Sequence, residues 1–223
     1  MIKSSEFLIT SAGDVRLSVV KCGHIDTNTG FIENVGRREA VLVDAPFGAL
    51  AASREILSPD TRIVAVLFTH GHWDHIGDAN AIKGLGAKTY SHSLDRGLIE
   101  HPGLMAIFAG IGDELEPCGI DVEICDGDIK AITDWLDVRC SWIPGHAAGD
   151  LSFYAESLGC VFVGDTLFRG CIGRSDLPGG NEELLISGIV KKILSLPDST
   201  IVIPGHGATT TVVEEKMHNE YVL

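Results

Sequence analysis

Several short apolar runs of this chain end at a histidine or an aspartate, and this pattern constrains the fold more than any other feature. Residues 65–69 lead to a cluster that begins at His70, and three later runs lead to His146, Asp165 and His206. Apolar runs of this length are typical of buried strands, and in open α/β folds functional groups gather beyond the carboxyl ends of strands. We therefore expect four strand ends to meet at one site.

The tripeptide Pro-Gly-His occurs twice, ending at His146 and again at His206. Proline ends a strand, and the glycine lets the backbone turn so that the next imidazole is presented. The repetition favours two histidines that serve the same kind of site.

The densest cluster of possible metal ligands is His70, His72, Asp74 and His75, which fall within one short turn. We expect Asp74 and His75 to point away from His70 and His72, so the four side chains cannot all bind one ion. The spacing favours two metals side by side, one bound by the first pair and one by the second, with a later carboxylate as the bridge. The complete predicted ligand set is His70, His72, Asp74, His75, His146, Asp165 and His206.

The order of strand-like and helix-like segments predicts an α/β fold. Strands alternate with helices in two halves, which suits a four-layer αββα sandwich, and the length of 223 residues fits a single domain spanning residues 1–223. The strands are expected within 6–20, 28–44, up to residue 69 and within 122–163, and the helices at 49–56, 76–83, 182–196 and after residue 206. Residues 91–118 are less regular and are expected to form helical cover over the site.

Charge and cysteine content exclude some partners. The net charge of −14 argues against nucleic acid or an anionic membrane as the main partner. No apolar stretch reaches the roughly 18 residues of a membrane span, and residues 1–6 lack the layout of a secretory signal, so we expect a cytoplasmic location.

The six cysteines form no CxxC pair. Cys171 lies near the predicted site, and we favour a structural role for it over a catalytic one.

Three further polar residues are candidates for supporting roles. Asp44 ends an apolar run and could accept the free N–H of a ligand histidine. Arg169 and Arg174 could pair with a substrate carboxylate, although Arg174 is more simply explained by pairing with Asp176 to order its loop. The histidines that have no other ligand-type residue beside them are expected at the surface: His24, His101 and His218.

The order of these motifs resembles the metallo-β-lactamase fold superfamily. Residues 164–170 (GDTLFRG), 173–180 (GRSDLPGG) and 204–207 (PGHG), with Glu215 and Asn219, look like its short bacterial glyoxalase II-like (hydroxyacylglutathione hydrolase-like) branch. The resemblance implies a metal-dependent hydrolase that acts on thioesters such as S-D-lactoylglutathione. It also implies two divalent ions, for which zinc is the first choice and iron or manganese are alternatives.

The expected mechanism is attack by a hydroxide shared between the two metals. Two Lewis acids lower the pKa of a shared water toward neutrality, with Asp165 as the bridge and Asp74 orienting the hydroxide, so these two carboxylates are the predicted catalytic residues. A thioester suits this chemistry because its thiolate leaving group, with a pKa of about 8.5, needs little acid assistance. The expected partner is thus a small-molecule thioester, and the sequence leaves the oligomeric state open.

Other functions on the same fold remain open. An iron persulfide dioxygenase would use one metal bound by two histidines and an aspartate, whereas the additional ligands Asp74, His75 and His206 favour the hydrolase. A non-catalytic binding protein would not need the full ligand set. A lactamase is less favoured because Asp165 stands where many lactamases have cysteine. The chain ends soon after His206, without the extension that contacts glutathione in longer glyoxalase II enzymes, so we expect a high KM for a glutathione thioester.

Overall fold

The computed structural model describes residues 5–111 and 115–223. The chain divides into two compact units, Met1–Glu123 and Ile124–Leu223. This division does not test the prediction of a single domain over residues 1–223, which stays a prediction. Among the described residues, no helix is long and apolar enough to cross a membrane.

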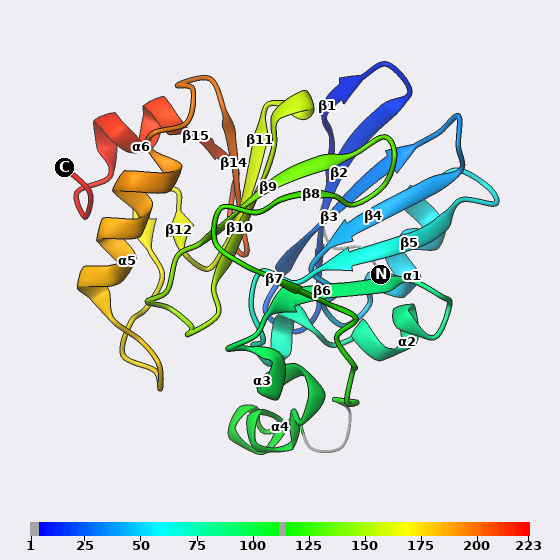
Figure 1. The fold of residues 1–223 in the computed structure, drawn as a ribbon, viewed down its shortest axis with the longest axis horizontal. Coiled ribbons are helices and arrows are strands. Elements are labelled where there is room, and N and C mark those ends of the chain that lie inside the picture. Colours follow the sequence, from blue (N-terminus) through cyan, green and yellow to red (C-terminus); the bar gives the residue numbers. More distant parts are fainter. Residues whose placement is uncertain (1–4, 112–114) are drawn as a thin grey trace. The chain divides into compact units, whose positions relative to one another are not determined.

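The first unit is built on a sheet whose strands lie in sequence order, β1 to β7 (Figure 1). Neighbours from β1 to β4 are antiparallel, whereas β4, β5 and β6 run parallel to one another. The strands are β1 (Ser5–Ala12), β2 (Val15–Cys22), β3 (Thr27–Asn34), β4 (Glu39–Val43), β5 (Arg62–Leu67), β6 (Lys88–His92) and β7 (Val122–Ile124). Because β4 and β5 are parallel, Asp44 and His70 follow strand ends at the same edge of the sheet.

The helices of this unit pack on one face of its sheet. Buried Phe31, Leu42 and Val66 belong to the same apolar cluster as Ala49 of α1 and Ile82 of α2. The small side chains of α1 let its backbone approach the sheet closely. The helical segments are α1 (Ala49–Ile56), the 3₁₀ turn η1 (Trp73–His75), α2 (Ala79–Lys83), α3 (Arg96–Glu100) and α4 (Gly103–Ala109).

The helix predicted at 49–56 is confirmed, but the one predicted at 76–83 begins only at Ala79. The cause is backbone pairing with Ala45, whose N–H donates to His75 O at 2.8 Å and whose carbonyl accepts from Asp78 N at 2.8 Å. These bonds hold the chain in a turn before α2 can start. Helices α3 and α4 lie in the irregular stretch 91–118, of which residues 112–114 lie outside the described residues.

The second unit contains a sheet in the order β15-β14-β11-β10-β9-β8. Strand β10 is antiparallel to both β9 and β11, and β14 is parallel to β11, so β9, β11 and β14 all run in one direction. Their carboxyl ends therefore share one edge, beyond which His146, Asp165 and His206 follow. The strands are β8 (Ile129–Ala131), β9 (Asp137–Trp142), β10 (Leu151–Ala155), β11 (Cys160–Gly164), β14 (Ile201–Pro204) and β15 (Thr210–Thr211).

Helices cover one face of this second sheet. Leu185 and Ile189 pack with Val161, Val163 and Val202 in one buried cluster. The predicted helix at 182–196 is present as α5 (Glu182–Gly188), which continues as the π-helical segment η4 (Ile189–Ile193); a 3₁₀ turn η3 spans Glu156–Leu158. The helix predicted after residue 206 is α6 (Val212–His218).

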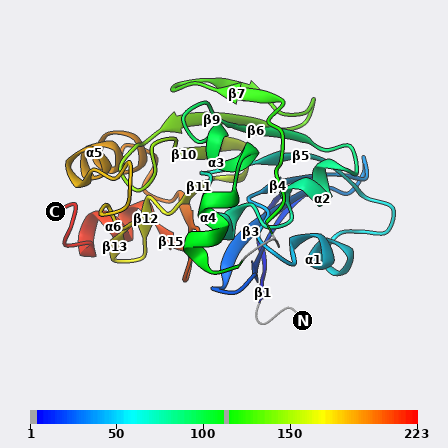
Figure 2. The same ribbon diagram turned by 90° about the horizontal axis from the view of Figure 1, so that it is seen from below.

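A short hairpin of β12 (Leu167–Phe168) and β13 (Cys171–Ile172) follows directly after Asp165. Figure 2 shows the hairpin beside α6. The sequence did not predict it, because two-residue strands leave no period-2 pattern. The hairpin carries the backbone that follows Asp165.

Candidate metal centre

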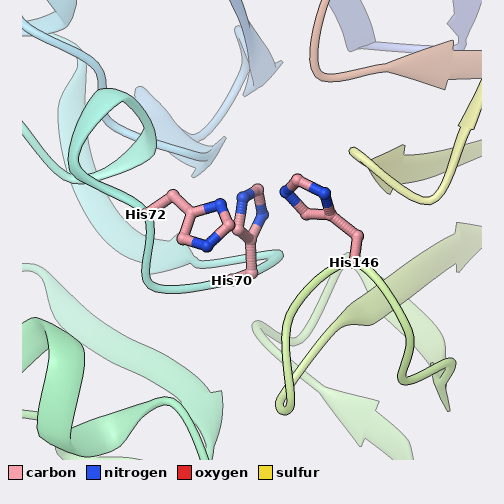
Figure 3. Close-up of side chains that lie close together, drawn as sticks. All are labelled: His70, His72 and His146. Atoms are coloured by element: carbon pink, nitrogen blue, oxygen red, sulfur yellow. The ribbon is translucent and has the colours of Figure 1, made fainter. Parts of the chain in front are cut away.

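The loop after β5 brings its ligand-type side chains close together, and Figure 3 shows two of them, His70 and His72. The His70 ring centroid lies 4.5 Å from that of His72 and 4.1 Å from that of His75. Possible ligand atoms of Asp74 and His75 lie within 4.8 Å of each other. The expectation that His75 points away from His70 is therefore wrong: η1 is one tight turn that returns His75 to the side of His70.

Asp44 connects this loop to the end of β4. Its carboxylate accepts three hydrogen bonds, each of 2.8 Å, from Thr69 N, Thr69 Oγ1 and His75 Nδ1. Asp44 is 2% exposed and has a φ of 60°, a left-handed conformation that aspartate tolerates better than most residues. The bond to His75 supports the prediction that Asp44 would hold a ligand histidine.

These hydrogen bonds determine which ring nitrogen of each histidine carries the proton. The Thr69 hydroxyl donates its one proton to Asp44, so it must accept from His70 Nδ1, 3.1 Å away. His75 Nδ1 likewise donates to the Asp44 carboxylate. Both imidazoles thus carry a lone pair on Nε2, and Nε2 of His75 lies 3.3 Å from Asp74 Oδ2, another acceptor. Acceptors that face each other at this distance are arranged as ligands of a cation.

Two further contacts hold this loop, and the sequence did not point to either of them. Thr27 Oγ1 donates to Asp74 Oδ2 at 3.0 Å, and Gly71 N donates to Asp95 Oδ2 at 2.8 Å. A Cβ on Gly71 would lie only 2.8 Å from Leu98 Cβ, so the loop needs glycine here for close packing. Asp95 is fully buried, which makes its contact with the loop a fixed one.

The second unit gathers its predicted ligands around one carboxylate. Nε2 of His146 lies 3.6 Å and Nε2 of His206 lies 3.5 Å from the same atom, Asp165 Oδ2. His146 Nδ1 donates to the carbonyl of Arg174 at 2.9 Å, which leaves the lone pair on Nε2 toward Asp165. Asp165 Oδ2 thus faces imidazole nitrogens that come from two separate strand ends.

Backbone geometry places His146 and Asp165. Gly145 has a φ of 146°, and a Cβ there would lie 2.5 Å from Leu185 Cβ, so the first Pro-Gly-His needs its glycine. Gly205, in the second Pro-Gly-His, has no positive φ. Asp150, which the sequence did not indicate, accepts from His146 N at 3.0 Å. A Cβ on Gly173 would lie 1.8 Å from the carbonyl oxygen of Asp165, so the hairpin can pass Asp165 only with glycine there.

Arg174 pairs with Asp176 through two hydrogen bonds of 2.7 and 2.8 Å, as the simpler of its two interpretations predicted. This bidentate partner lowers the pKa of Asp176 to about 2 and raises the pKa of Arg174. The ion pair orders the segment whose carbonyl holds His146. Arg169 is exposed at the tip of the β12–β13 hairpin, where its role as a substrate contact stays a prediction.

Glu215 of α6 ties the hairpin down. Its buried carboxylate accepts from Thr210 Oγ1 at 2.7 Å, Gly170 N at 3.0 Å and Asn219 Nδ2 at 2.7 Å. Asn219 Nδ2 also donates to the carbonyl of Cys171 at 3.1 Å. The last helix therefore holds the backbone of the hairpin tip in place.

The six cysteines and several histidines lie outside the predicted ligand set. The sequence predicted the surface histidines correctly, since His24, His101 and His218 are all exposed. Burial raises the pKa of the Cys22 and Cys118 thiols to about 11 and that of the Cys140 and Cys160 thiols to about 12. Cys171 is exposed, and its carbonyl rather than its thiol contacts Asn219.

The donor set itself fits divalent first-row metals. Neutral imidazole nitrogens with carboxylate oxygens are the ligands of zinc and of non-haem iron sites, and hydrogen bonds on the remote Nδ1 atoms are typical of ligating histidines. In each unit a histidine Nδ1 donates a hydrogen bond to an oxygen atom, and a carboxylate oxygen faces the Nε2 atom of the same histidine. The His and Asp side chains are thus suited to divalent metals, without distinguishing zinc from iron.

Comparison with known proteins identifies the family. The sequence model described as the Metallo-beta-lactamase superfamily matches residues 23–206. Hydroxyacylglutathione hydrolase GloC of Haemophilus influenzae is 33% identical over 193 residues, which cover 83% of this chain and 88% of that protein. The crystal structure of BLEG-1 B3 metallo-beta-lactamase has a TM-score of 0.82, 31% identity, and coverage of 92% of this chain and 99% of its own. A di-iron-bound form of TTHA1623 has a TM-score of 0.78, 32% identity, and coverage of 91% and 98%.

The chain belongs to the metallo-β-lactamase superfamily. The predicted resemblance and the α/β fold class are confirmed, and the relatives include a hydroxyacylglutathione hydrolase, as the motifs around Asp165 and His206 indicated. Membership of this superfamily, together with the clusters of His and Asp side chains that could hold a metal ion, identifies a metal-dependent enzyme of the metallo-hydrolase type.

Proposed function

We propose that this protein hydrolyses thioesters such as S-D-lactoylglutathione, using two divalent ions held by the full predicted ligand set. One observation carries the proposal: the Nε2 lone pair of His75 faces Asp74 in the first unit, and that of His146 faces Asp165 in the second. The ligands of the proposed centre are His70, His72, Asp74, His75, His146, Asp165 and His206. Zinc is our first choice, with iron or manganese as alternatives.

The chain's own groups would hold and orient the centre. Asp165 and Asp74 would both help to hold the ions, and Asp74, whose Oδ2 accepts a hydrogen bond from Thr27 Oγ1, would also orient the attacking water. Ions bound there would supply Lewis acidity that lowers the pKa of water toward neutrality. Asp44 keeps the Nδ1 proton of His75, and through Thr69 that of His70, in place, so both rings keep their Nε2 lone pairs.

The choice of a thioester rests on the relatives. GloC, a hydroxyacylglutathione hydrolase, is similar over most of both chains, and the di-iron form of TTHA1623 supports a two-metal centre in a protein of this size and fold. The acidic net charge favours a small-molecule partner over nucleic acid. A cytoplasmic location and a single domain over residues 1–223 are part of this proposal.

The test is metal analysis of the purified protein, followed by thiol release from glutathione and non-glutathione thioesters. We expect close to two ions per chain and hydrolysis that chelation abolishes and metal restores. Oxygen uptake with glutathione persulfide is measured in parallel. The hydrolase proposal would be wrong if the protein held no more than one tight ion after reconstitution, or if it consumed oxygen without cleaving any thioester. The mononuclear iron persulfide dioxygenase would then be the better assignment.

A β-lactam is the second candidate substrate, because the chain is 31% identical to a protein whose structure is described as a B3 metallo-beta-lactamase. A chromogenic cephalosporin therefore belongs in the same panel. Cleavage of the cephalosporin at a kcat/KM above that of every thioester would make the lactam the better assignment.

A further inference from the structure

A groove of about 320 Å³ lies between the end of β2 and the first turns of α1, outside the proposed metal ligands. We call it the β2–α1 groove. It is lined by Lys21, Cys22, His24, Phe47, Ala52 and Glu55, among others. Nothing in the proposed hydrolysis uses these residues, so the groove is free for another role.

The groove opens beside the metal-binding loop. The ring of His24, at its rim, lies 5.5 Å from that of Phe47 and 6.0 Å from that of Trp73, and Trp73 stands between the predicted ligands His72 and Asp74. Thr27, at the start of β3, donates to Asp74 from the same turn. A molecule whose reacting end lies at this loop would have to pass His24 to reach the groove.

The groove carries one charge of each sign. Within the part of the chain that the structure describes, neither Lys21 nor Glu55 forms an ion pair with another residue. Between them the wall is apolar, with Phe47 and Ala52. Cys22 adds no charge near neutral pH, because burial and the nearby Asp78 carboxylate raise its pKa to about 11. The groove thus presents an uncommitted ammonium, an uncommitted carboxylate and an apolar stem.

We propose that the β2–α1 groove binds the amino-acid end of the substrate's thiol portion, with Glu55 pairing to its α-ammonium and Lys21 to its α-carboxylate. This inference rests on the proposed thioester hydrolysis and adds where the amino-acid head group of its substrate binds. Two exposed ion pairs of opposite sense select a zwitterion over a simple anion or cation.

The kinetic test compares Lys21→Met and Glu55→Gln with Lys88→Met and Glu220→Gln, matched changes at exposed positions away from the groove. The substrates are S-D-lactoylglutathione and the D-lactoyl thioester of N-acetylcysteamine, which has no head group. We expect each groove variant to raise KM for the glutathione thioester about fivefold with little change in kcat. Neither groove variant should alter cleavage of the N-acetylcysteamine thioester, and the two control variants should match the wild type on both substrates.

Calorimetric binding of S-methylglutathione, which cannot be hydrolysed, separates this inference from the proposed function. Binding that weakens about fivefold in Lys21→Met and Glu55→Gln, but not in the controls, supports the groove even if no thioester is cleaved. Thioester hydrolysis with equal KM values in groove and control variants would overturn the groove and keep the hydrolase. The wild-type protein should also bind S-methylglutathione more weakly once the γ-glutamyl amine of this ligand is N-acetylated. Unchanged affinity for the acetylated ligand would overturn the proposed role of the groove.

Discussion

Replacing Asp44 by asparagine tests how the metal loop is held. The substitution keeps the size of the side chain and removes its charge. Asparagine adopts positive φ as readily as aspartate, so the φ of 60° adds no backbone strain. The change therefore isolates the carboxylate from the fold of the turn.

The expected magnitude follows from the three hydrogen bonds that Asp44 accepts. Asparagine has one acceptor oxygen, so if that oxygen faces His75 and the Thr69 hydroxyl, its amide group must face Thr69 N–H, another donor. A lost charge-assisted hydrogen bond in a buried site costs about 1.5–3 kcal/mol. Residues that orient metal ligands contribute about 10–100-fold to metal affinity, or roughly 1.4–2.8 kcal/mol, so the two magnitudes agree.

The assay is competition for metal with a chromophoric chelator, together with urea unfolding of the metal-free protein. Asp60→Asn is the matched control, since Asp60 also has a positive φ of 64° but is exposed and pairs with Arg38 at 3.5 Å. Asp44→Asn should lose about 10–100-fold in metal affinity, and Asp60→Asn should lose none. An Asp44→Asn protein that binds metal within twofold of wild type would refute the argument that Asp44 sets the proton positions on His75 and His70.

Three further predictions follow from the geometry. Asp165→Ala should lower kcat by more than about 100-fold, whereas Arg174→Ala, which disturbs only loop order, should lower it by less than about 10-fold. Steady-state kinetics measure both values. An Asp165→Ala protein that retains most of its kcat would contradict the proposal that Asp165 bridges the metals. Gly173→Ala, with its Cβ 1.8 Å from Asp165 O, should destabilise the fold by at least about 1–3 kcal/mol in urea unfolding, while Gly97→Ala, with nothing within 4 Å, should not destabilise it. A thiol reagent at pH 8 should label Cys125 and Cys171 but not Cys22, Cys118, Cys140 or Cys160 until the protein unfolds. Because burial raises the buried thiols from a pKa of 9.0 to about 11 or 12, the unfolded chain releases those protons first, and the unfolding midpoint should fall as pH rises above about 9; four rapidly labelled buried thiols would contradict this.

The sequence predicted the strands and the residues at their ends because both leave local patterns. Apolar runs ending at Asp44, His70 and Asp165 mark β4, β5 and β11. Strand β4 is parallel to β5, and β11 is parallel to β14, so within each sheet the residues that follow these strands lie at one edge, as the sequence predicted. The start of α2 was misjudged, because backbone bonds to Ala45 hold the preceding turn.

The supporting contacts were less predictable. Thr27 reaches Asp74 across a separation of 47 residues, and Asp95 reaches Gly71 across 24. Neither contact produces a periodic or local signature, since a single buried threonine or aspartate looks like any polar residue in sequence. Asp150 lies only four residues after His146 and was easier to predict from the sequence. A carboxylate just beyond a Pro-Gly-His turn indicates a side chain that can accept from the backbone N–H groups of that turn.

The bonds from Glu215 and Asn219 to the β12–β13 hairpin have a practical consequence. They make the stretch of backbone that follows Asp165 depend on α6, far along the chain. Trimming of the last helix by a protease, or a bulky tag that unwinds it, would release Gly170 and Cys171 while leaving the sheet intact. Such a preparation would keep its strand signal in circular dichroism and yet lose activity, so intact mass should be checked before any inactive sample is taken as evidence about the catalytic residues.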